Sequence, residues 1–462
     1  MSATTPQNPR SDALPGLSTG TTAVMLLASI LPLIDSSLVN VLLPSISASL
    51  GVPESSVQLG ISGYMLAATG GIILSTTCLR RFGSRQVWFV AVAGFAVASA
   101  LVGFATSLPV FVAARVVQGA ACGFIMPAVQ QLTAEIVGRQ GMRAALATLG
   151  LPAVVAPALG PLLGGILVDA VGWRVLFLVN VPVAAAAALI AVSVLPRTRG
   201  VRTRLGIAQA AQAVPALLGM VGLLWVVSSA PTLPTWGVVT ASCLAVALIT
   251  VFCVLDLHAR TPLLDVSLYR RASFATVMGL CLVVGAVFYG TLLSTSLHVQ
   301  GDLGQPSWMA GVLLGVQGLG AWVVRSLIRG PWKSANAFGV IAVGLLVASA
   351  GTVGVQAITT WDAVAFGVAV TCSFIRGLGL GACTLLALSA AYEVVTDDQA
   401  PAVGAHSRLM LQFGGALGTA LVGVWPGSAV GLGVAVAVVA VLGASGAAVL
   451  VVRQRTAGVP TP

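Results

Sequence analysis

The sequence predicts an all-α polytopic membrane protein, and three observations lead to that fold class. Of its 462 residues, 58% are hydrophobic and 7% are charged, whereas soluble globular chains carry about 45–50% apolar and 25% charged residues. The mean hydropathy is +1.03. Apolar stretches of about 20 residues, enough for a helix to cross a bilayer, recur along the chain. This composition excludes a disordered chain and a secreted disulfide scaffold. It also excludes a soluble enzyme with a membrane anchor, because no stretch is long and polar enough for a separate soluble domain.

Fourteen stretches fit a membrane-spanning helix. They cover residues 21–43, 55–78, 87–106, 109–135, 144–168, 174–195, 207–229, 236–256, 273–298, 307–328, 335–356, 363–392, 405–424 and 427–452. We expect two six-helix bundles, residues 21–195 and 273–452. A linker over 196–272 carries the seventh and eighth helices, and residues 1–20 and 453–462 form short tails.

The basic residues predict how the helices are oriented. Arginines gather after the second, fourth, sixth, eighth, tenth and fourteenth stretches, whereas loops after odd-numbered stretches carry Arg174 alone. Because cytoplasmic loops carry the excess of Lys and Arg, both termini are expected in the cytoplasm. Membrane orientation thus accounts for the net charge of +10, and nucleic acid is not an expected partner. Lys333 is the single lysine among 22 basic residues, which is typical of an actinobacterium-like genome; we expect a bacterial plasma membrane.

The first stretch contains a carboxylate within an apolar run, LIDSSLVNVLLP. A charge in hydrocarbon costs several kcal/mol, so it usually faces a cavity or a partner. Asp35 lies about 12 Å below the predicted outer end at Leu43, at 1.5 Å per residue. We interpret Asp35 as a proton-titrating or substrate-contacting group. The alternative is a buried carboxylate that only fixes helix packing.

The fourth stretch contains ARVVQG, and Arg115 lies about 9 Å below the outer end. This depth matches that of Asp35, so we expect the two charges to meet if their helices are neighbours. An adjacent arginine favours the ionised carboxylate and burial disfavours it, so the pair forms either a proton switch or a fixed structural ion pair. The face of Arg115 also carries Gln118, Cys122 and Met126, which with Asn40 are expected to line a substrate cavity or to pack as an interior stripe.

The fifth stretch, LGLPAVVAPALGPLLGG, has three prolines within ten residues. Proline removes a backbone donor and bends a helix, and small residues four apart let another helix approach closely. This pattern predicts a gating or tightly packed helix. Its residues are Pro157, Gly160, Pro161, Gly164 and Gly165.

Other features have plainer interpretations. Trp173 and Arg174 are expected to anchor the outer interface, and His298 is expected to be a solvated surface residue. The seven cysteines include no C-x-x-C pair, so neither disulfides nor a metal site is expected. The stretches 109–135 and 363–392 each carry an arginine toward the outer end, and a glutamate stands at the inner end of the first and directly after the second. The spacing differs, but the pattern favours two repeated halves.

Together these motifs resemble the major facilitator superfamily, and within it the fourteen-helix drug:proton antiporters, most firmly over residues 30–196. LIDSSLVNVLLP resembles that branch's first-helix motif through Asp35, Asn40 and Pro44. The R-x-x-Q-G motif is matched by Arg115, Gln118 and Gly119, the helix 5 motif by Gly160, Pro161, Gly164 and Gly165, and the W-R-x-x-F-x-x-N-x-P run by Trp173, Arg174, Phe177, Asn180 and Pro182.

The resemblance implies alternating access, with proton influx driving export of hydrophobic drugs, antibiotics or secondary metabolites. It ties Arg115 to proton coupling and the helix 5 motif to export direction. We expect no cofactor beyond the proton gradient and no catalytic residues. The expected partners are a small hydrophobic substrate, protons and lipid, and a monomer is expected.

The loop after the second stretch departs from the family pattern. TTCLRRFGSR keeps Arg81, Gly83 and Arg85, but Arg80 replaces the aspartate that normally joins a cytoplasmic charge network. Two acids near the predicted inner face, Glu135 and Glu393, are candidate substitutes in an inner gate. Intramembrane acids are otherwise sparse, which favours neutral, weakly charged or zwitterionic substrates.

Three alternatives remain open at this point. The same fold could import a small metabolite, such as an amino acid or sugar derivative, or export one narrowly. A membrane-embedded enzyme would need paired carboxylates, a metal cluster or a large outer domain. A channel or sensor fits a Gly- and Pro-interrupted repeat less well than a carrier does. Direct use of ATP is not expected because the chain has no phosphate-binding G-x-x-x-x-G-K-[ST] loop.

Overall fold

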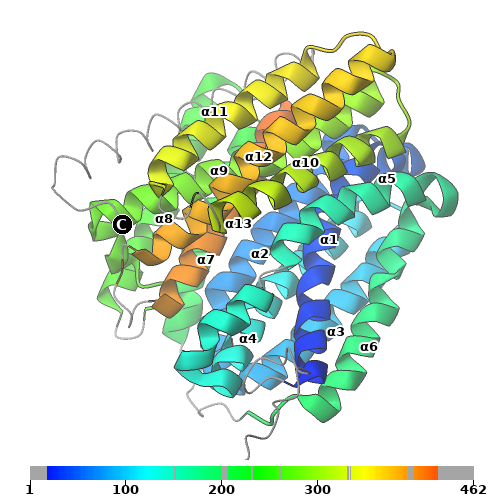
Figure 1. Ribbon diagram of the computed structural model, residues 1–462. Coiled ribbons are helices and arrows are strands. Elements are labelled where there is room, and N and C mark those ends of the chain that lie inside the picture. Colours follow the sequence, from blue (N-terminus) through cyan, green and yellow to red (C-terminus); the bar gives the residue numbers. More distant parts are fainter. Residues whose placement is uncertain are drawn as a thin grey trace, which may run out of the picture.

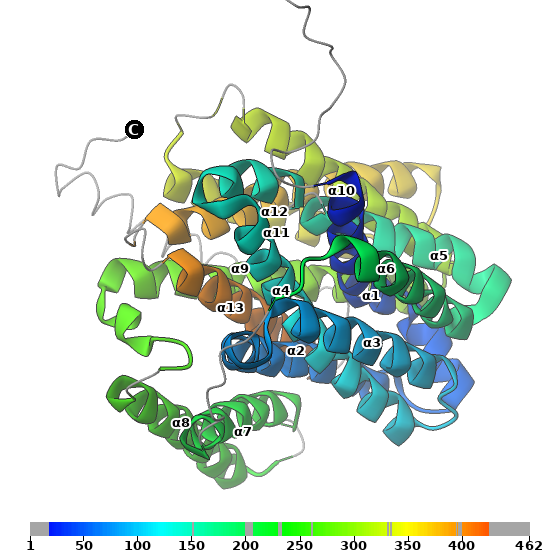
Figure 2. The same ribbon diagram turned by 90° about the horizontal axis from the view of Figure 1, so that it is seen from below.

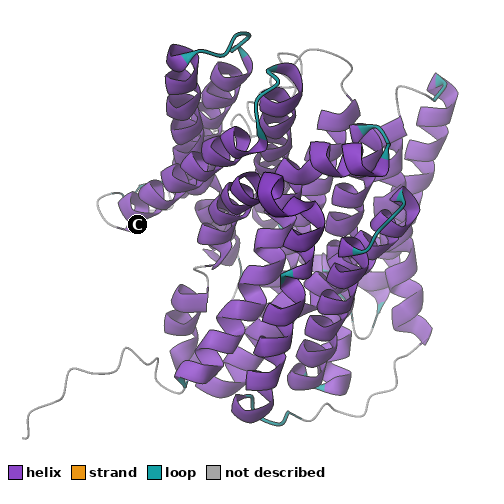
Figure 3. Ribbon diagram, turned by 90° about the vertical axis from the view of Figure 1, so that its right-hand side faces the viewer, coloured by secondary structure: helices purple, strands orange, loops and turns teal. Residues whose placement is uncertain are grey.

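The structure is a computed structural model that describes residues 18–149, 152–198, 207–229, 233–259, 262–329, 332, 335–393, 395 and 400–424. Its helices are α1 (Thr19–Leu50), α2 (Glu54–Phe82), α3 (Ser84–Gly103), α4 (Leu108–Leu149), α5 (Pro152–Leu178), α6 (Asn180–Val194), α7 (Ile207–Ser229), α8 (Thr235–His258), η1 (Val266–Arg270), α9 (Ala272–Leu297), η2 (His298–Asp302), α10 (Ser307–Arg329), α11 (Ala337–Gln356), α12 (Ala363–Glu393) and α13 (Ala400–Val424). Figure 3 shows helices joined by short loops and no strand in these ranges.

The described helices have the length and composition of membrane spans. Ten helical stretches in these ranges are long and apolar enough to cross a bilayer. Each of the first thirteen predicted spans overlaps a helix of the structure. The fourteenth, residues 427–452, lies outside the described residues. The chain is therefore an all-helical membrane protein.

One predicted helix boundary is wrong. The sequence placed residues 144–149 at the start of the fifth helix, but they continue α4, which ends at Leu149. Helix α5 begins at Pro152, and proline is favoured at the first position of a helix because its missing N–H would have no partner there. A second break lies inside α5 at Gly172, whose φ of 77° suits glycine and few other residues. It separates the fifth and sixth spans close to the predicted position.

The helices form two groups with a helix pair beside them. Figure 1 shows α1–α6 on one side of the molecule and α9–α13 on the other. Figure 2 shows α7 and α8 set apart from both groups. The pair is not isolated, because α7 packs against α2 and α13 as well as against α8.

Glycines bring equivalent helices of the two groups together in the same register. A Cβ atom on Gly119 or Gly123 of α4 would strike backbone carbonyl oxygens of α2. Gly377 and Gly381 of α12 approach the backbone of α10 in the same way, also one helical turn apart. The two groups are thus built on a common packing pattern, in which Gly119 corresponds to Gly377.

Several contacts between the groups lie toward the predicted outer end. Gly165 of α5 packs against the start of α10, where its added Cβ would lie 2.5 Å from the Ser307 carbonyl oxygen. Gln300, just beyond α9, donates to the Val41 carbonyl oxygen of α1 at 3.1 Å. Gln58 of α2 donates to the Thr419 carbonyl oxygen of α13. The arrangement is therefore joined at that end of the molecule.

Candidate functional site

The candidate site is a buried polar cluster centred on Asp35 of α1. Asp35 lies one turn beyond Pro32, in the middle of a long apolar helix, and only 1% of its surface is exposed. Its Oδ2 atom accepts a hydrogen bond from Nη1 of Arg115 on α4, and both side chains are fully buried. The structure thus confirms the predicted contact between these charges. Breaking such a buried pair by removing one partner costs about 3–5 kcal/mol.

Two amides hold the other carboxylate oxygen. The Nε2 atom of Gln118 and the Nδ2 atom of Asn180 each donate to Asp35 Oδ1 at 3.0 Å. The Gln118 amide also donates to Ser99 Oγ of α3 at 2.7 Å, and its Oε1 accepts from Arg115 at 2.6 Å. Helices α1, α3, α4 and α6 therefore meet in one hydrogen-bonded network around a single carboxylate.

Aromatic rings complete the environment of Arg115. Its guanidinium carbon lies 4.2 Å from the ring centre of Tyr64 on α2 and 5.5 Å from that of Phe177 on α5. Stacking on aromatic faces stabilises a buried guanidinium. Tyr64 is itself fixed, because its hydroxyl donates to the Pro32 carbonyl oxygen at 3.1 Å. The arginine is therefore held by its stacking as well as by its ion pair.

The hydrogen bonds around Asp35 depend on its charge. As a carboxylate it accepts three hydrogen bonds, two at Oδ1 and one at Oδ2. A protonated carboxyl has one donor and less accepting capacity. Adding a proton would therefore disrupt at least one of these bonds and would cancel the charge that holds Arg115. The arrangement can convert the gain of a proton into a rearrangement of α1 against α4.

The structure brings together only part of the predicted set. Asp35, Arg115 and Gln118 belong to the cluster. Asn40 is fully buried but donates to carbonyl oxygens of its own helix, at Ser36 and Ser37. On α4, Cys122 is buried beside the side chain of Tyr64, at the edge of the cluster, and Met126 is half-buried further along the helix.

Three members of the cluster were missed from sequence. Asn180 was matched as part of a family motif but was not assigned to the site. Ser99 and Tyr64 gave no signal, because a serine or tyrosine within an apolar helix is ordinary. Only the packing of α2 and α3 around α4 reveals their role.

Helix α5 makes the close contacts that its small residues predict. A Cβ on Gly160 would lie 2.1 Å from Ser37 Oγ, and one on Gly164 would lie 2.8 Å from the Leu38 side chain, both on α1. On the α10 side, the Pro161 carbonyl oxygen and Gly165 meet Gly311. Pro157 lies in the helix, but its side chain is outside the described residues. One helix thus touches the Asp35 helix and the opposite group.

The loop between α2 and α3 is held at the predicted inner end. Gly83 adopts a φ of 83°, and Arg85 donates to the Val192 carbonyl oxygen at 2.9 Å. Arg81 stacks on the neighbouring ring of Phe82. Glu135 of α4 accepts from Ser84 Oγ at 2.5 Å, so this acid does contact the altered loop.

The second acid of the predicted inner gate cannot be placed in the same way. Glu393 ends α12, and its side chain lies outside the described residues.

Two interface expectations are wrong. His298 is 3% exposed, because the chain continues beyond α9 as one further turn that places the imidazole between Asp302 Oδ2 and the Ile358 carbonyl oxygen, each at 3.0 Å. Trp173 is 2% exposed, because it follows the break at Gly172 and packs edge-on against Phe111 and Phe177.

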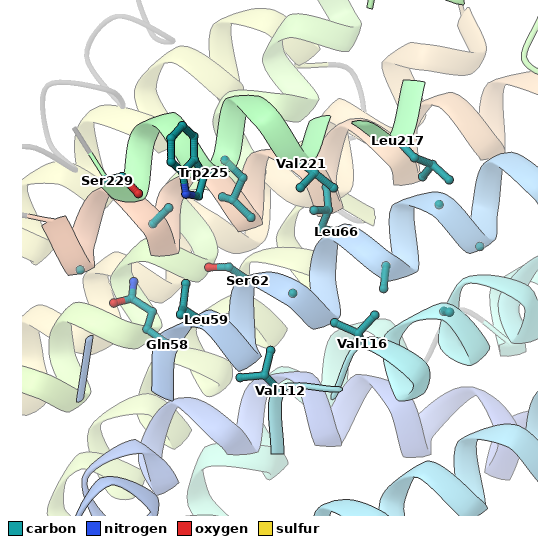
Figure 4. Close-up of a pocket in the computed structure, with 18 of the residues that line it drawn as sticks. Gln58, Leu59, Ser62, Leu66, Val112, Val116, Leu217, Val221, Trp225 and Ser229 are labelled. Atoms are coloured by element: carbon teal, nitrogen blue, oxygen red, sulfur yellow. The ribbon is translucent and has the colours of Figure 1, made fainter. Parts of the chain in front are cut away.

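A separate apolar cavity of about 820 Å³ lies between the first group and the helix pair. Figure 4 shows Leu217, Val221 and Trp225 of α7 along one side of it. The opposite side is formed by α2 and α4, and Ala420 and Gly423 of α13 complete the lining. Its few polar groups include Gln58 and Ser62 of α2, so a hydrophobic molecule would fit it better than a hydrated one.

Known proteins agree with this architecture. The family model described as Major Facilitator Superfamily matches residues 25–419. The chain is 29% identical over 429 residues to the multidrug resistance protein B homolog of Mycobacterium tuberculosis, covering 87% of this chain and 75% of the relative. It is 31% identical over 414 residues to puromycin resistance protein pur8 of Streptomyces alboniger, covering 86% and 80%.

A solved structure matches the fold over nearly the whole chain. The POT family transporter PepTSo superposes with a TM-score of 0.70 at 15% identity, covering 94% of this chain and 97% of that one. This likeness concerns the fold alone. With the family model matching most of the sequence, the chain belongs to the major facilitator superfamily, a family of membrane transporters and not of enzymes.

Proposed function

We propose that this chain is a proton-coupled exporter of hydrophobic drugs, antibiotics or secondary metabolites in a bacterial plasma membrane. The observation that carries the proposal is the buried carboxylate of Asp35, held by Arg115 between membrane helices. Ionisable groups in such positions mark proton or substrate pathways. Relatives named for multidrug and puromycin resistance support the substrate class. Fourteen helices with both termini in the cytoplasm remain part of this proposal.

The coupling path runs from Asp35 through α1 to α5. Two residues beyond the carboxylate, Ser37 Oγ donates to the Ala156 carbonyl oxygen of α5 at 3.2 Å. The other side of α5 packs against α10 through Gly165 and Gly311. A shift of α1 on protonation of Asp35 therefore reaches the seam between the groups through one intervening helix.

The contacts between the groups support an alternating-access cycle. They gather at the predicted outer end, where α5 meets α10 and α2 meets α13. We interpret this arrangement as the one that excludes the outer solution. Export requires this seam to part after substrate has bound from the inner side or from the bilayer.

The apolar cavity beside α7 supports uptake of substrate from the lipid. Its lining is mainly apolar, so a hydrophobic compound that enters it removes apolar surface from water. Asn40, Cys122 and Met126 remain candidate substrate contacts. Gln118 belongs instead with the proton-coupling residues, because its amide is bonded to Asp35 and Ser99.

The proposal is tested by uptake into inverted membrane vesicles with an imposed proton gradient. Labelled puromycin and a panel of neutral hydrophobic compounds serve as probes. Wild type is compared with Asp35→Asn and with a protonophore. A matched control is Asp169→Asn, which removes an exposed carboxylate near the predicted outer end of α5.

Uptake that requires the gradient, disappears in Asp35→Asn and persists in Asp169→Asn is the expected result. Uptake that survives Asp35→Asn would move the proton site elsewhere, with Glu135 the next carboxylate to replace. No uptake of any compound by folded protein would reject drug export and favour a carrier of one small metabolite.

A further inference from the structure

Helix α12 carries a second buried arginine that the proposed export cycle does not use. Arg376 is fully buried, and its Nη1 atom donates to Thr295 Oγ1 of α9 at 2.7 Å. Its Nε and Nη2 atoms are also buried and have no hydrogen-bond acceptor among the described residues. These two nitrogens form one edge of the guanidinium plane, so a whole donor edge is unsatisfied.

No carboxylate of the described chain reaches this arginine. Asp35 pairs with Arg115 in the first group, and Asp302 pairs with His298 beyond α9, so neither acid is the partner of Arg376. Glycine contacts align α9 with α1. Gly414 of α13 packs on the Leu282 carbonyl oxygen of α9, and Gly160 of α5 packs on the Ile34 carbonyl oxygen of α1. The position of α9 in register with Asp35 is therefore Val283, which has no charge.

The rest of the C-terminal sequence cannot supply the missing acid. Residues 399–462 contain no aspartate or glutamate. Glu393 lies 17 positions beyond Arg376 on the same helix, about 25 Å away at 1.5 Å per residue. Asp397 and Asp398 follow it in sequence. The counter-charge of Arg376 must therefore come from outside these segments.

A buried guanidinium cannot discard its charge as a lysine can, because it stays protonated in proteins. Leaving such a charge unpaired in a low-dielectric interior costs far more than one bond to a neutral hydroxyl returns. The same edge of two parallel N–H groups matches the two oxygens of a carboxylate. Thr295 also retains its own hydroxyl proton for donation, since its oxygen is the acceptor in the bond to Arg376.

We propose that Arg376 and Thr295 form a binding site for a carboxylate anion, held in bidentate fashion by Nε and Nη2 of the arginine and by the threonine hydroxyl. The carboxylate is either a small free anion or the acidic group of an amphipathic solute. Binding places in the second helix group the charge that Asp35 provides in the first. The site is independent of the export proposal, because it requires neither a gradient nor transport.

The test measures thermal unfolding of the purified full-length protein in lipid nanodiscs. Sodium 2-naphthoate, sodium acetate and sodium chloride are titrated separately, with 2-naphthamide as the uncharged analogue. A ligand that binds only the folded state raises the unfolding midpoint in proportion to the logarithm of its concentration. We expect 2-naphthoate to raise the midpoint of wild type and 2-naphthamide to leave it unchanged.

Two variants assign the effect to the site. Arg376→Gln is expected to raise the 2-naphthoate concentration needed for half-saturation roughly tenfold or more, since a charge-assisted bidentate pair is lost. Arg174→Gln, which removes an arginine bonded to Ser49 and the Ala105 carbonyl oxygen, should respond as wild type does. If Arg376→Gln does not fold, two further variants replace it. Thr295→Val keeps the charge of Arg376 and should still weaken binding of 2-naphthoate. Arg376→Lys keeps a positive charge but removes the two parallel N–H donors, and it should also weaken binding.

The outcomes separate the source of the anion. Equal responses to acetate and 2-naphthoate identify a free carboxylate, and a response to 2-naphthoate alone identifies an amphipathic solute. A response to chloride alone overturns the bidentate assignment. No response of wild type to any carboxylate, or an equal response in the Arg376 and Thr295 variants, overturns the proposal.

Discussion

The two helix groups each bury an arginine, with Arg376 standing three residues away from the position that corresponds to Arg115. Nε and Nη2 of both arginines have no hydrogen-bond acceptor among the described residues, and the two sites differ in how the charge itself is balanced. Gly119 and Gly377 occupy the same packing position, so the sequence R-x-x-Q-G of α4 corresponds to S-x-x-R-G of α12. In the first group Arg115 bonds a carboxylate and an amide and stacks on two rings. In the second, Arg376 replaces the glutamine, and one threonine hydroxyl is its bonded partner among the described residues.

This difference separates two kinds of buried charge within one fold, one that can bind a proton and one that can bind an anion. A carboxylate built into the chain can take up and release a proton without any other ligand. An arginine without a built-in acid responds instead to the anions available to it. The first group therefore fits the proposed proton cycle, and the second fits the proposed carboxylate site.

The largest expected effect comes from breaking the pair in the first group. Arg115→Gln leaves the Asp35 charge buried without its cation and should lower the free energy of unfolding by about 3–5 kcal/mol. Asp35→Asn combined with Arg115→Gln removes both charges and should restore much of that loss. Thermal unfolding of the two single variants and the double variant in nanodiscs gives the coupling energy. Additive losses would show that the contact contributes no pairwise stability.

A smaller effect is expected from giving the second group its own acid. Thr295→Asp places a carboxylate where the hydroxyl now accepts from Arg376 at 2.7 Å. Hydrogen bonds to charged groups contribute about 1.5–3 kcal/mol, so the unfolding midpoint should rise in anion-free buffer. Stabilisation by 2-naphthoate should disappear, because the site is then occupied from within. Thr291→Asp on the same helix is the matched control. Undiminished stabilisation by 2-naphthoate would contradict the prediction.

The smallest expected effect concerns a residue at the edge of the first cluster. Ser99→Ala removes the oxygen that accepts from Gln118 at 2.7 Å, while the amide keeps its bond to Asp35. The cost should be about 1 kcal/mol, with gradient-driven uptake retained. Unfolding and vesicle uptake measured on the same preparation check both parts. Complete loss of uptake in folded Ser99→Ala protein would assign this serine a direct part in proton transfer.

The sequence was sufficient for much of the fold because a membrane helix must be long, apolar and internally hydrogen-bonded. The end of α4 was misplaced because apolar residues continue through the boundary, and only Pro152 marks it. The contact of Asp35 with Arg115 could be predicted because charges are costly in an apolar run, whereas Gln118 was expected to line a substrate cavity and instead bonds Asp35. Ser99 and Tyr64 could not be predicted, because their role depends on which helices become neighbours. Arg376 was visible as a charge, but its lack of an acid is a property of the packed group.

The contact of Gly165 with α10 leaves no room for a larger residue where the two helix groups meet. A single added methyl group at this position would lie 2.5 Å from one backbone atom and 2.9 Å from another, closer than folded proteins allow. Gly165→Ala would thus act as a wedge between the two helix groups. It offers a way to hold the molecule in its other arrangement long enough for that arrangement to be imaged.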